Sequence, residues 1–499
     1  MLRVPRIAPR EVIFGAMMLA IFIVAVEATI VATAMPTIVA DLGGLRYFSW
    51  VFGSYLLTQA VTIPIYGRLA DFFGRKALLI CAIVIFLVGS ILSGFAHDMF
   101  ALIFFRAIQG IGAGGVQPVS TTIVGDLYQG RDRARVQGYL STMWAFAAVI
   151  GPLLGAFLIA HFGWPIIFWI NVPVGLACIA VVLRAYHEQI ARVSHRIDYL
   201  GSALLALGVG TLMFVLVDLG NIPPLTAAAL VIVGLALLAF LLRHELRAPE
   251  PMMPLSLYRI RVIAVANVGN VFVGGMVMGI TAFMPTFVQG ALGKSPVAAG
   301  SVLIALFVGW TCGSIGGARL QLRASFRTVA ILAAVPLLSG SAVLASLHAG
   351  SNIVYVYVGL ALLGLGFGTL NSVFVVSTQG AVEWAMRGAA TSSLIFMRQI
   401  GQAVGSSTFG AIFNFGIYSR IPDAGSAVAQ LVDPVRHAHV SAFDLARDAS
   451  AVGESLHGVY LIVFALSVGV SALALALPPQ LRSGHMIPRP SGERVGHEA

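Results

Sequence analysis

The chain consists largely of long apolar stretches that are separated by short segments rich in charged and turn-forming residues. Most of these stretches are about twenty residues long, the length that an α-helix needs to cross the hydrocarbon core of a bilayer. The pattern predicts about fourteen membrane-spanning helices, near residues 11–33, 48–67, 77–96, 99–122, 135–159, 164–183, 199–217, 223–242, 262–288, 296–316, 328–347, 352–377, 388–416 and 457–477.

The composition indicates a polytopic membrane protein. Apolar residues make up 59% of the 499 residues and charged residues only 10%, whereas a soluble domain carries about 25% charged residues. These values exclude an ordinary soluble enzyme, a disordered chain and a fibrous repeat. The apolar stretches are continuous, which favours helices over the short alternating strands of a membrane barrel.

The basic residues are distributed unevenly between the segments that join the predicted spans. With the N-terminus inside, 23 of the 30 Lys and Arg residues fall in cytoplasmic segments, five fall outside and two lie within spans. The positive-inside rule therefore predicts an even number of spans and two cytoplasmic termini. It also explains the net charge of +10 without nucleic-acid binding, because no basic stripe carries interleaved aromatic residues.

Ionisable groups within the spans are candidates for function, because burying them in a membrane is costly. Glu27 is the only acid well inside an apolar stretch, and Arg106 and Arg398 are the two cations within spans. Glu27 and Arg106 lie at similar depth in spans 1 and 4, so they can pair if these spans are neighbours. A buried carboxyl group can exchange protons near neutral pH. A purely structural role is the alternative for Glu27, and Arg398 either lines a cavity or bonds backbone groups.

A charged loop joins spans 2 and 3. It runs from Gly67 to Lys76 as Gly-Arg-Leu-Ala-Asp-Phe-Phe-Gly-Arg-Lys. A turn that only sets orientation would explain the basic residues. It would not explain why Gly67 and Gly74 flank Asp71, or why Arg75 and Lys76 directly follow Gly74.

This loop resembles the signature between spans 2 and 3 of the major facilitator superfamily. The chain as a whole is similar to the fourteen-span drug:proton antiporters of that superfamily. Phe72 departs from the loop pattern, in which a base is usual. Further resemblance lies in Glu27-Ala28-Thr29-Ile30-Val31 for span 1, Arg106-Ala107-Ile108-Gln109-Gly110 for span 4, Gly151-Pro152-Leu153-Leu154-Gly155 for span 5, and Arg387-Gly388 with Arg398-Gln399-Ile400-Gly401 for span 13.

The resemblance implies an all-α major facilitator fold with two six-helix bundles and two inserted spans. Residues 11–196 would form the first bundle, 197–247 the inserted pair and 248–480 the second bundle. The second bundle would carry a mildly acidic external loop at residues 417–456. Residues 1–10 and 481–499 would be cytoplasmic tails.

The function that the resemblance implies is proton-coupled export of lipophilic, cationic drugs or related small molecules from the cell. Glu27 and Arg106 would couple transport to protons, and Gly151, Pro152 and Gly155 form the antiport signature. The cytoplasmic gate would comprise Gly67, Asp71, Gly74, Arg75, Lys76 and Arg387. Candidates for the cavity are Gln59, Gln117, Trp144, Asn270, Phe283, Gln289, Asn371 and Arg398, and helix packing is the competing explanation for each aromatic one.

The expected partners are a small-molecule substrate, protons and the lipid bilayer of the inner (plasma) membrane. The chain would work as a monomer, and the resemblance allows a periplasmic adaptor protein as a further partner. No metal, cofactor or nucleic acid is expected. An exporter of an endogenous metabolite, a siderophore or a lipid fits the sequence equally well. A membrane enzyme or a sensor is a remote alternative, because one buried carboxylate without a mid-span His supplies no catalytic pair or zinc site.

Overall fold

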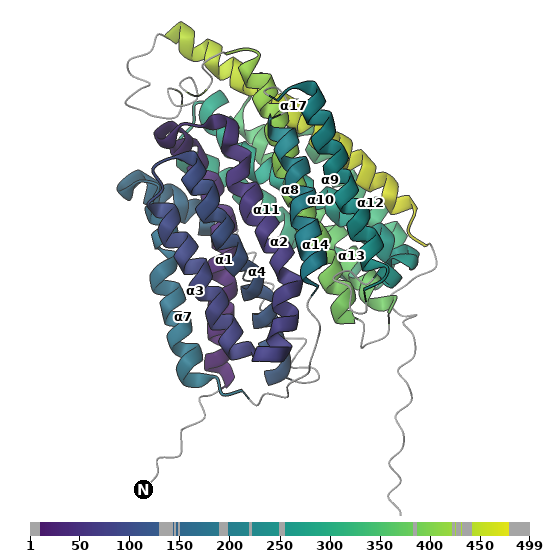
Figure 1. Ribbon diagram of the computed structural model, residues 1–499. Helices are drawn as coiled ribbons and strands as arrows, with labels where there is room; N and C mark the ends of the chain where they lie inside the picture. The colour runs from purple at the N-terminus through teal and green to yellow at the C-terminus, as the bar shows by residue number, and fades with distance from the viewer. Residues whose placement is uncertain are drawn as a thin grey trace, which may run out of the picture.

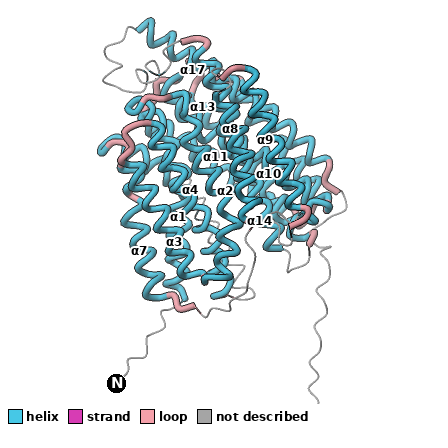
Figure 2. The backbone as a smooth tube through the Cα atoms, in the orientation of Figure 1, coloured by secondary structure: helices cyan, strands magenta, loops and turns pink. Residues whose placement is uncertain are grey.

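The computed structural model describes residues 10–128, 143, 146–147, 150–188, 198–218, 222–248, 255–382, 387–421, 425, 431 and 442–478. The described part is helical throughout and contains no strand (Figures 1 and 2). Its main helices are α1 Arg10–Leu42, α2 Phe48–Phe73, α3 Arg75–Gly94, α4 Met99–Leu127, α6 Ile166–Trp169, α7 Asn171–Ala185, α8 Tyr199–Asp218, α9 Pro224–Glu245, α10 Arg261–Thr286, α11 Pro296–Leu320, α12 Phe326–Ala345, α13 Ile353–Gly380, α14 Arg387–Tyr418 and α17 Ala442–Leu475, and α10 continues into the π-helical turn η3 Phe287–Ala291.

Eleven helices in the described ranges are long and apolar enough to cross a membrane. The helices α2 and α14, with 26 and 32 residues, fall outside this set. The helical segment 150–162 occupies the end of the predicted fifth span. The chain is therefore an all-helical, multi-pass membrane protein, whereas the count of fourteen spans and the cytoplasmic termini stay predictions.

The predicted external loop 417–456 is only partly a loop. Helix α17 begins at Ala442, so the second part of that segment extends the last span instead of connecting to it. Its charged residues pair along the helix: Arg447 lies 3.5 Å from Asp444 and 3.0 Å from Asp448. The pair at i,i+3 spacing supports a helix that continues beyond the apolar stretch, which a hydropathy pattern alone does not reveal.

The helices pack in two groups. In the first group, α4 lies against α1, α2 and α3, and α7 lies against α1 and α3. In the second group, α13 lies against α11 and α12, and α10 and α17 lie against α14. Figure 1 shows the first group in purple and blue beside the second in green and yellow. The helix α8 packs against α2 and α14 as well as α9, so the hairpin predicted as an insertion touches both groups.

The two groups meet along a contact between α2 and α14, here called the seam. Ser49 of α2 lies against Gly410 of α14, where a Cβ atom on the glycine would overlap the serine hydroxyl. The side-chain amide of Asn414 donates to the carbonyl of Arg46 at 2.7 Å. Phe283 of α10 lies at the same end of the molecule, with its ring 5.0 Å from that of Phe48. These contacts lie at the end of α1 that is farthest from Arg10.

Candidate functional site

Glu27 and Arg106 form an ion pair in the interior of the first group. Glu27 lies in α1 with no exposed surface, and Arg106 lies in α4 with 1% of its surface exposed. The Arg106 Nη1 atom is 2.6 Å from the Glu27 Oε1 atom. The pairing expected from their similar depth in the spans is therefore confirmed, while a role in proton coupling stays a prediction.

A set of buried amides and hydroxyls surrounds this ion pair. Asn171, the first residue of α7, donates to the other carboxylate oxygen of Glu27 at 2.6 Å and to the hydroxyl of Ser90 at 2.9 Å. Arg106 donates to Gln109 at 2.6 Å, and Gln109 donates to Ser90 at 3.1 Å. The cluster of Glu27, Ser90, Arg106, Gln109 and Asn171 is thus a closed network that joins four helices.

The guanidinium of Arg106 has further partners. Its Nε atom donates to the carbonyl of Val51 at 3.3 Å. The ring of Tyr55 lies 4.2 Å from the guanidinium carbon and that of Phe168 lies 5.9 Å away, both within cation–π range. Because each charge is matched inside the chain, the cost of removing the pair from water is offset by short hydrogen bonds. Removing one partner of such a pair typically costs about 3–5 kcal/mol.

Glycines allow the helices of this cluster to approach one another. A Cβ atom on Gly89 of α3 would overlap the backbone of Gln109, and one on Gly110 would overlap Tyr55 and Thr58 of α2. Gly112 and Gly114 make similar close approaches. The glycine-rich run in span 4 therefore serves helix packing, as small residues do in membrane helices.

The segment predicted as the antiport signature packs directly against the helix that carries Glu27. A Cβ atom on Gly151 would overlap the hydroxyl of Thr29, and one on Gly155 would overlap Thr33. Both threonines lie within two turns of Glu27. Pro152 faces the second group instead, because its carbonyl lies against Gly300 of α11. The segment thus contacts α1 and α11 at once.

The predicted cytoplasmic gate is only partly described. Gly67 and Asp71 lie near the end of α2, and Gly74 separates α2 from α3 with a φ of 89°, which a glycine adopts without strain. The side chains of Asp71 and Arg387 lie outside what the structure describes, so their expected contact is not tested.

An unpredicted acid binds the start of α3. The carboxylate of Glu188 accepts the backbone N–H groups of Arg75 at 2.8 Å and Lys76 at 3.0 Å. The ammonium group of Lys76 donates to the carbonyls of Leu183 and Tyr186, at the end of α7. The loop between spans 2 and 3 is therefore attached to α7. The usual sequence signal for such a contact is an acid next to the start of the helix in the sequence. Glu188 lies 112 residues from Lys76 along the chain, so no local pattern indicates this contact.

The cavity candidates have different surroundings. Phe283 and Gln289 are buried, and the ring of Phe283 contacts those of Phe48 and Phe413 beside the seam. Asn270 is also buried and donates to the carbonyl of Ala266 at 2.9 Å. Gln59 is buried, while Gln117, Asn371 and Arg398 are half-buried. Trp144 lies outside the described residues.

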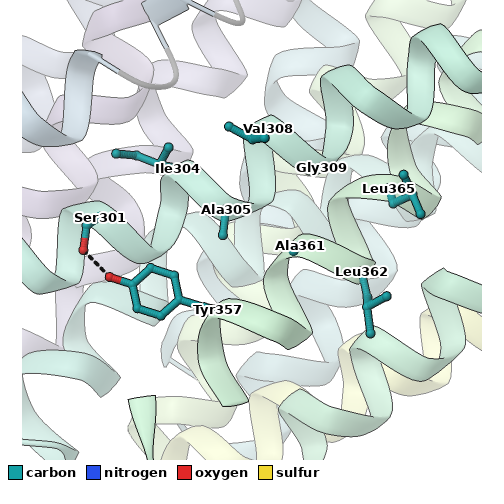
Figure 3. Close-up of a pocket in the computed structure, with 9 residues that line it drawn as sticks. All are labelled: Ser301, Ile304, Ala305, Val308, Gly309, Tyr357, Ala361, Leu362 and Leu365. Carbon is teal, nitrogen blue, oxygen red and sulfur yellow. Dashed lines mark hydrogen bonds between the residues drawn. The ribbon is translucent and has the colours of Figure 1, made fainter. Parts of the chain in front are cut away.

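A hollow that none of these candidates lines lies between α11 and α13 (Figure 3). Its volume is about 570 Å³, and apolar side chains form almost all of its wall. The hydroxyls of Ser301 and Tyr357 are hydrogen-bonded at 2.5 Å on one side of it. None of its lining residues was predicted as a site, because each is an ordinary residue of an apolar helix.

Comparison with known proteins gives consistent results. A family model described as Major Facilitator Superfamily matches residues 17–406. "Multidrug resistance protein 3" of Bacillus subtilis (strain 168) is 33% identical over 418 residues, which cover 83% of this chain and 81% of that protein. "Multidrug transporter protein MdtP" of the same organism is 31% identical over 413 residues, or 81% and 75% of the two chains.

Solved structures show the same fold. A bacterial homologue of the human lysosomal transporter Spinster superposes with a TM-score of 0.66 at 15% sequence identity. The superposition covers 93% of this chain and 96% of that one.

Proposed function

Because the chain belongs to the Major Facilitator Superfamily and is an efflux transporter of the membrane, we propose that it exports lipophilic small molecules in exchange for protons. The observation that carries the proposal is the ion pair of Glu27 and Arg106, buried in the interior of the first helix group. Transporters of this kind use intramembrane carboxylates as proton relays. The proposed location is the inner (plasma) membrane, where the chain works as a monomer with fourteen spans and both termini in the cytoplasm.

Protonation of Glu27 changes the balance of charge within the cluster. A neutral carboxyl group no longer compensates Arg106, whose charge then stays buried with only Gln109, a backbone carbonyl and two aromatic rings around it. An uncompensated buried charge is costly, so the protonated cluster favours a different arrangement of α1 and α4. Binding or release of one proton thereby biases the equilibrium between two conformations.

Two contacts pass this change on to the rest of the molecule. The helix α1 packs against α10 of the second group, and Gly151 and Gly155 hold the signature segment against Thr29 and Thr33 of α1. Rearrangement of α1 therefore acts on both groups. The two groups rock against each other around the cargo, so that the cargo site opens to each side of the membrane in turn. The loop from Gly67 to Lys76, with Asp71 and Arg387, serves as the gate on the cytoplasmic side.

The cargo is a lipophilic molecule, and the sequence predicts a cation with Glu27 as its counter-charge. In the described arrangement Glu27 is already paired and fully buried, so a cation gains access to it only after Arg106 moves. Growth assays with and without lipophilic cations separate drug export from export of an endogenous metabolite, siderophore or lipid. Such assays in cells with and without a periplasmic adaptor test that partner.

The experiment that tests the function is dye efflux from proteoliposomes with an imposed pH gradient. The panel contains cationic, zwitterionic and anionic fluorescent dyes. Efflux of at least one dye that depends on the gradient is expected for the wild type and not for Glu27→Gln. Glu245→Gln is the matched control, since Glu245 is also buried but lies at the end of α9. Equal gradient-driven efflux by all three proteins would contradict the proposal.

A further inference from the structure

Arg398 is the second cation within the spans, and it lies in the first half of α14. It is 11 residues after the start of this helix at Arg387, or about 16 Å along the helix axis. A bilayer core is about 30 Å thick, so a residue about 16 Å along α14 lies within the core if this helix crosses the membrane.

The side of α14 that carries Arg398 faces the protein. A Cβ atom on Gly274 of α10 would overlap the backbone of Arg398 and contact Gln402. Gly405 and Phe409 continue the same face by helical spacing and pack against Gly275 and Gly279 of α10. The exposed side of α14 lies elsewhere, at Val404 and Phe415, the latter of which is 81% exposed. The backbone of Arg398 thus lies against α10, and by helical spacing its half-buried side chain is on a different side of α14 from these exposed residues.

Among the described residues, Arg398 has no hydrogen-bond acceptor, ion-pair partner or aromatic ring in contact. Arg106 is the internal comparison, because it bonds Glu27, Gln109 and a backbone carbonyl and stacks on Tyr55. Both side chains carry a charge that cannot be removed at physiological pH. Within the described residues, Arg106 is matched by an acid and Arg398 is not.

The sequence offers no counter-charge at this depth. Between residues 251 and 422 the only acid is Glu383, which precedes the start of α14 by four residues. The helices packed against α14 carry their acids near their ends, such as Asp71 in α2, Asp218 in α8 and Asp448 in α17. The remaining intramembrane acid, Glu27, is bound to Arg106.

We propose that Arg398 is the anion-recognition residue of the cargo site and binds the carboxylate of an amphiphilic cargo. The planar guanidinium presents two parallel N–H donors that match a carboxylate. Gln402 is half-buried and lies one turn along the same face of α14, so its amide is placed to bind a polar group of the same cargo. The inference rests on the proposed export function, and it makes the cargo a lipophilic acid or a zwitterion rather than a simple cation.

The charge of the cargo sets the response of transport to voltage. Exchange of one proton for one monovalent cation moves no net charge across the membrane. Exchange of one proton for a zwitterion moves one charge, and exchange for a monoanion moves two. Efflux of a carboxylate cargo should therefore accelerate when the membrane is polarised negative inside, even without a pH gradient.

The test is equilibrium binding to purified, detergent-solubilised full-length protein. The probes are a lipophilic fluorescent monocarboxylate, its methyl ester and a lipophilic monovalent cation. The wild type should bind the acid at least about tenfold more tightly than the ester, as expected for a charge-assisted pair. Arg398→Gln should reduce acid binding to the level of the ester, and Arg398→Lys should restore part of it. Arg420→Gln is the matched control, because Arg420 is exposed and pairs with Glu454.

Binding of the ester shows that each variant is folded, so a loss confined to the acid cannot result from misfolding. Equal affinity of the wild type for acid and ester, or full acid binding by Arg398→Gln, would overturn the proposal. A second result would also overturn the proposal: millimolar chloride displaces the acid, and without chloride the acid and the ester bind with equal affinity. That result would indicate a site for inorganic anions. Binding needs no proton gradient, so a failure of proton coupling in Glu27→Gln leaves this result unaffected and the two proposals are tested separately.

Discussion

Replacement of Gly410 by leucine should prevent the seam between α2 and α14 from closing. Gly410 faces Ser49 so closely that even a Cβ atom would overlap the serine hydroxyl. The neighbouring contacts leave little room for adjustment, because Asn414 is bonded to the backbone at Arg46 and Gly53 lies against Met213 of α8. The added side chain therefore has to be accommodated by separation of the two helices.

The magnitude follows from the cost of overpacking, which is typically about 1–3 kcal/mol in a well-packed interior. If the molecule alternates between a state with the seam closed and one with it open, only the closed state bears this cost. The ratio of the two states should then shift toward the open one by about 5- to 150-fold. Transport should slow as well, because each cycle passes through the closed state.

The assay measures the reaction of a cysteine at Ser407 with an impermeant thiol reagent. The hydroxyl of Ser407 is buried near Gly53, so a thiol there is shielded while the seam is closed. The background lacks the three native residues Cys81, Cys178 and Cys312. Gly410→Leu should raise the rate of labelling by the factor given above.

The control for this experiment is Gly316→Leu in α11, because a Cβ atom at Gly316 meets nothing within 4 Å. It should leave the labelling rate unchanged. A melting temperature close to that of the control shows that the Gly410 variant is folded. An unchanged labelling rate in a folded Gly410→Leu protein would refute the reasoning, because it would mean that the seam tolerates a large side chain while closed.

Three further predictions concern the same contacts. Asn171→Ala removes a short hydrogen bond to Glu27. It should lower the free energy of unfolding by about 1.5–3 kcal/mol in thermal unfolding, and it should slow gradient-driven efflux. Unchanged stability and unchanged efflux would show that the amide is dispensable. Glu188→Ala exposes two backbone N–H groups in the first turn of α3, and it should lower stability by about 0.5–2 kcal/mol while Glu188→Gln loses less. Asn414→Ala removes the hydrogen bond that joins α14 to the carbonyl of Arg46, so it should raise the labelling rate of the cysteine introduced by Ser407→Cys by about 2- to 10-fold; an unchanged rate would argue against opening of the seam.

The sequence predicted the spans and the central ion pair because both depend on local properties. The apolar stretches give the positions of most helices to within a few residues, and the rarity of charge within them identifies Glu27 and Arg106. Their similar depth was enough to anticipate the contact that the structure shows at 2.6 Å. The helical start of α17 at Ala442 was missed, since its charged residues are paired along the helix and give no hydropathy signal.

The partners of the ion pair could not be predicted in the same way. Gln109 and Asn171 are amides in apolar stretches, like many others in this chain, and their role depends on which helices are neighbours. Asn171 reaches Glu27 across 144 residues of sequence. Phe283 illustrates the same difficulty. Its ring contact with Phe48 depends on how the two helix groups meet, which no pattern within one helix reveals.

Substrate-induced proton release from the detergent-solubilised protein tests the central claim most directly, namely that Glu27 carries the proton exchanged for cargo. The cargo in this measurement is the dye with the fastest gradient-driven efflux. The wild type should release protons when the dye is added, and Glu27→Gln should bind the dye but release none. Undiminished proton release by Glu27→Gln would show that protons are carried elsewhere in the chain and would contradict the account.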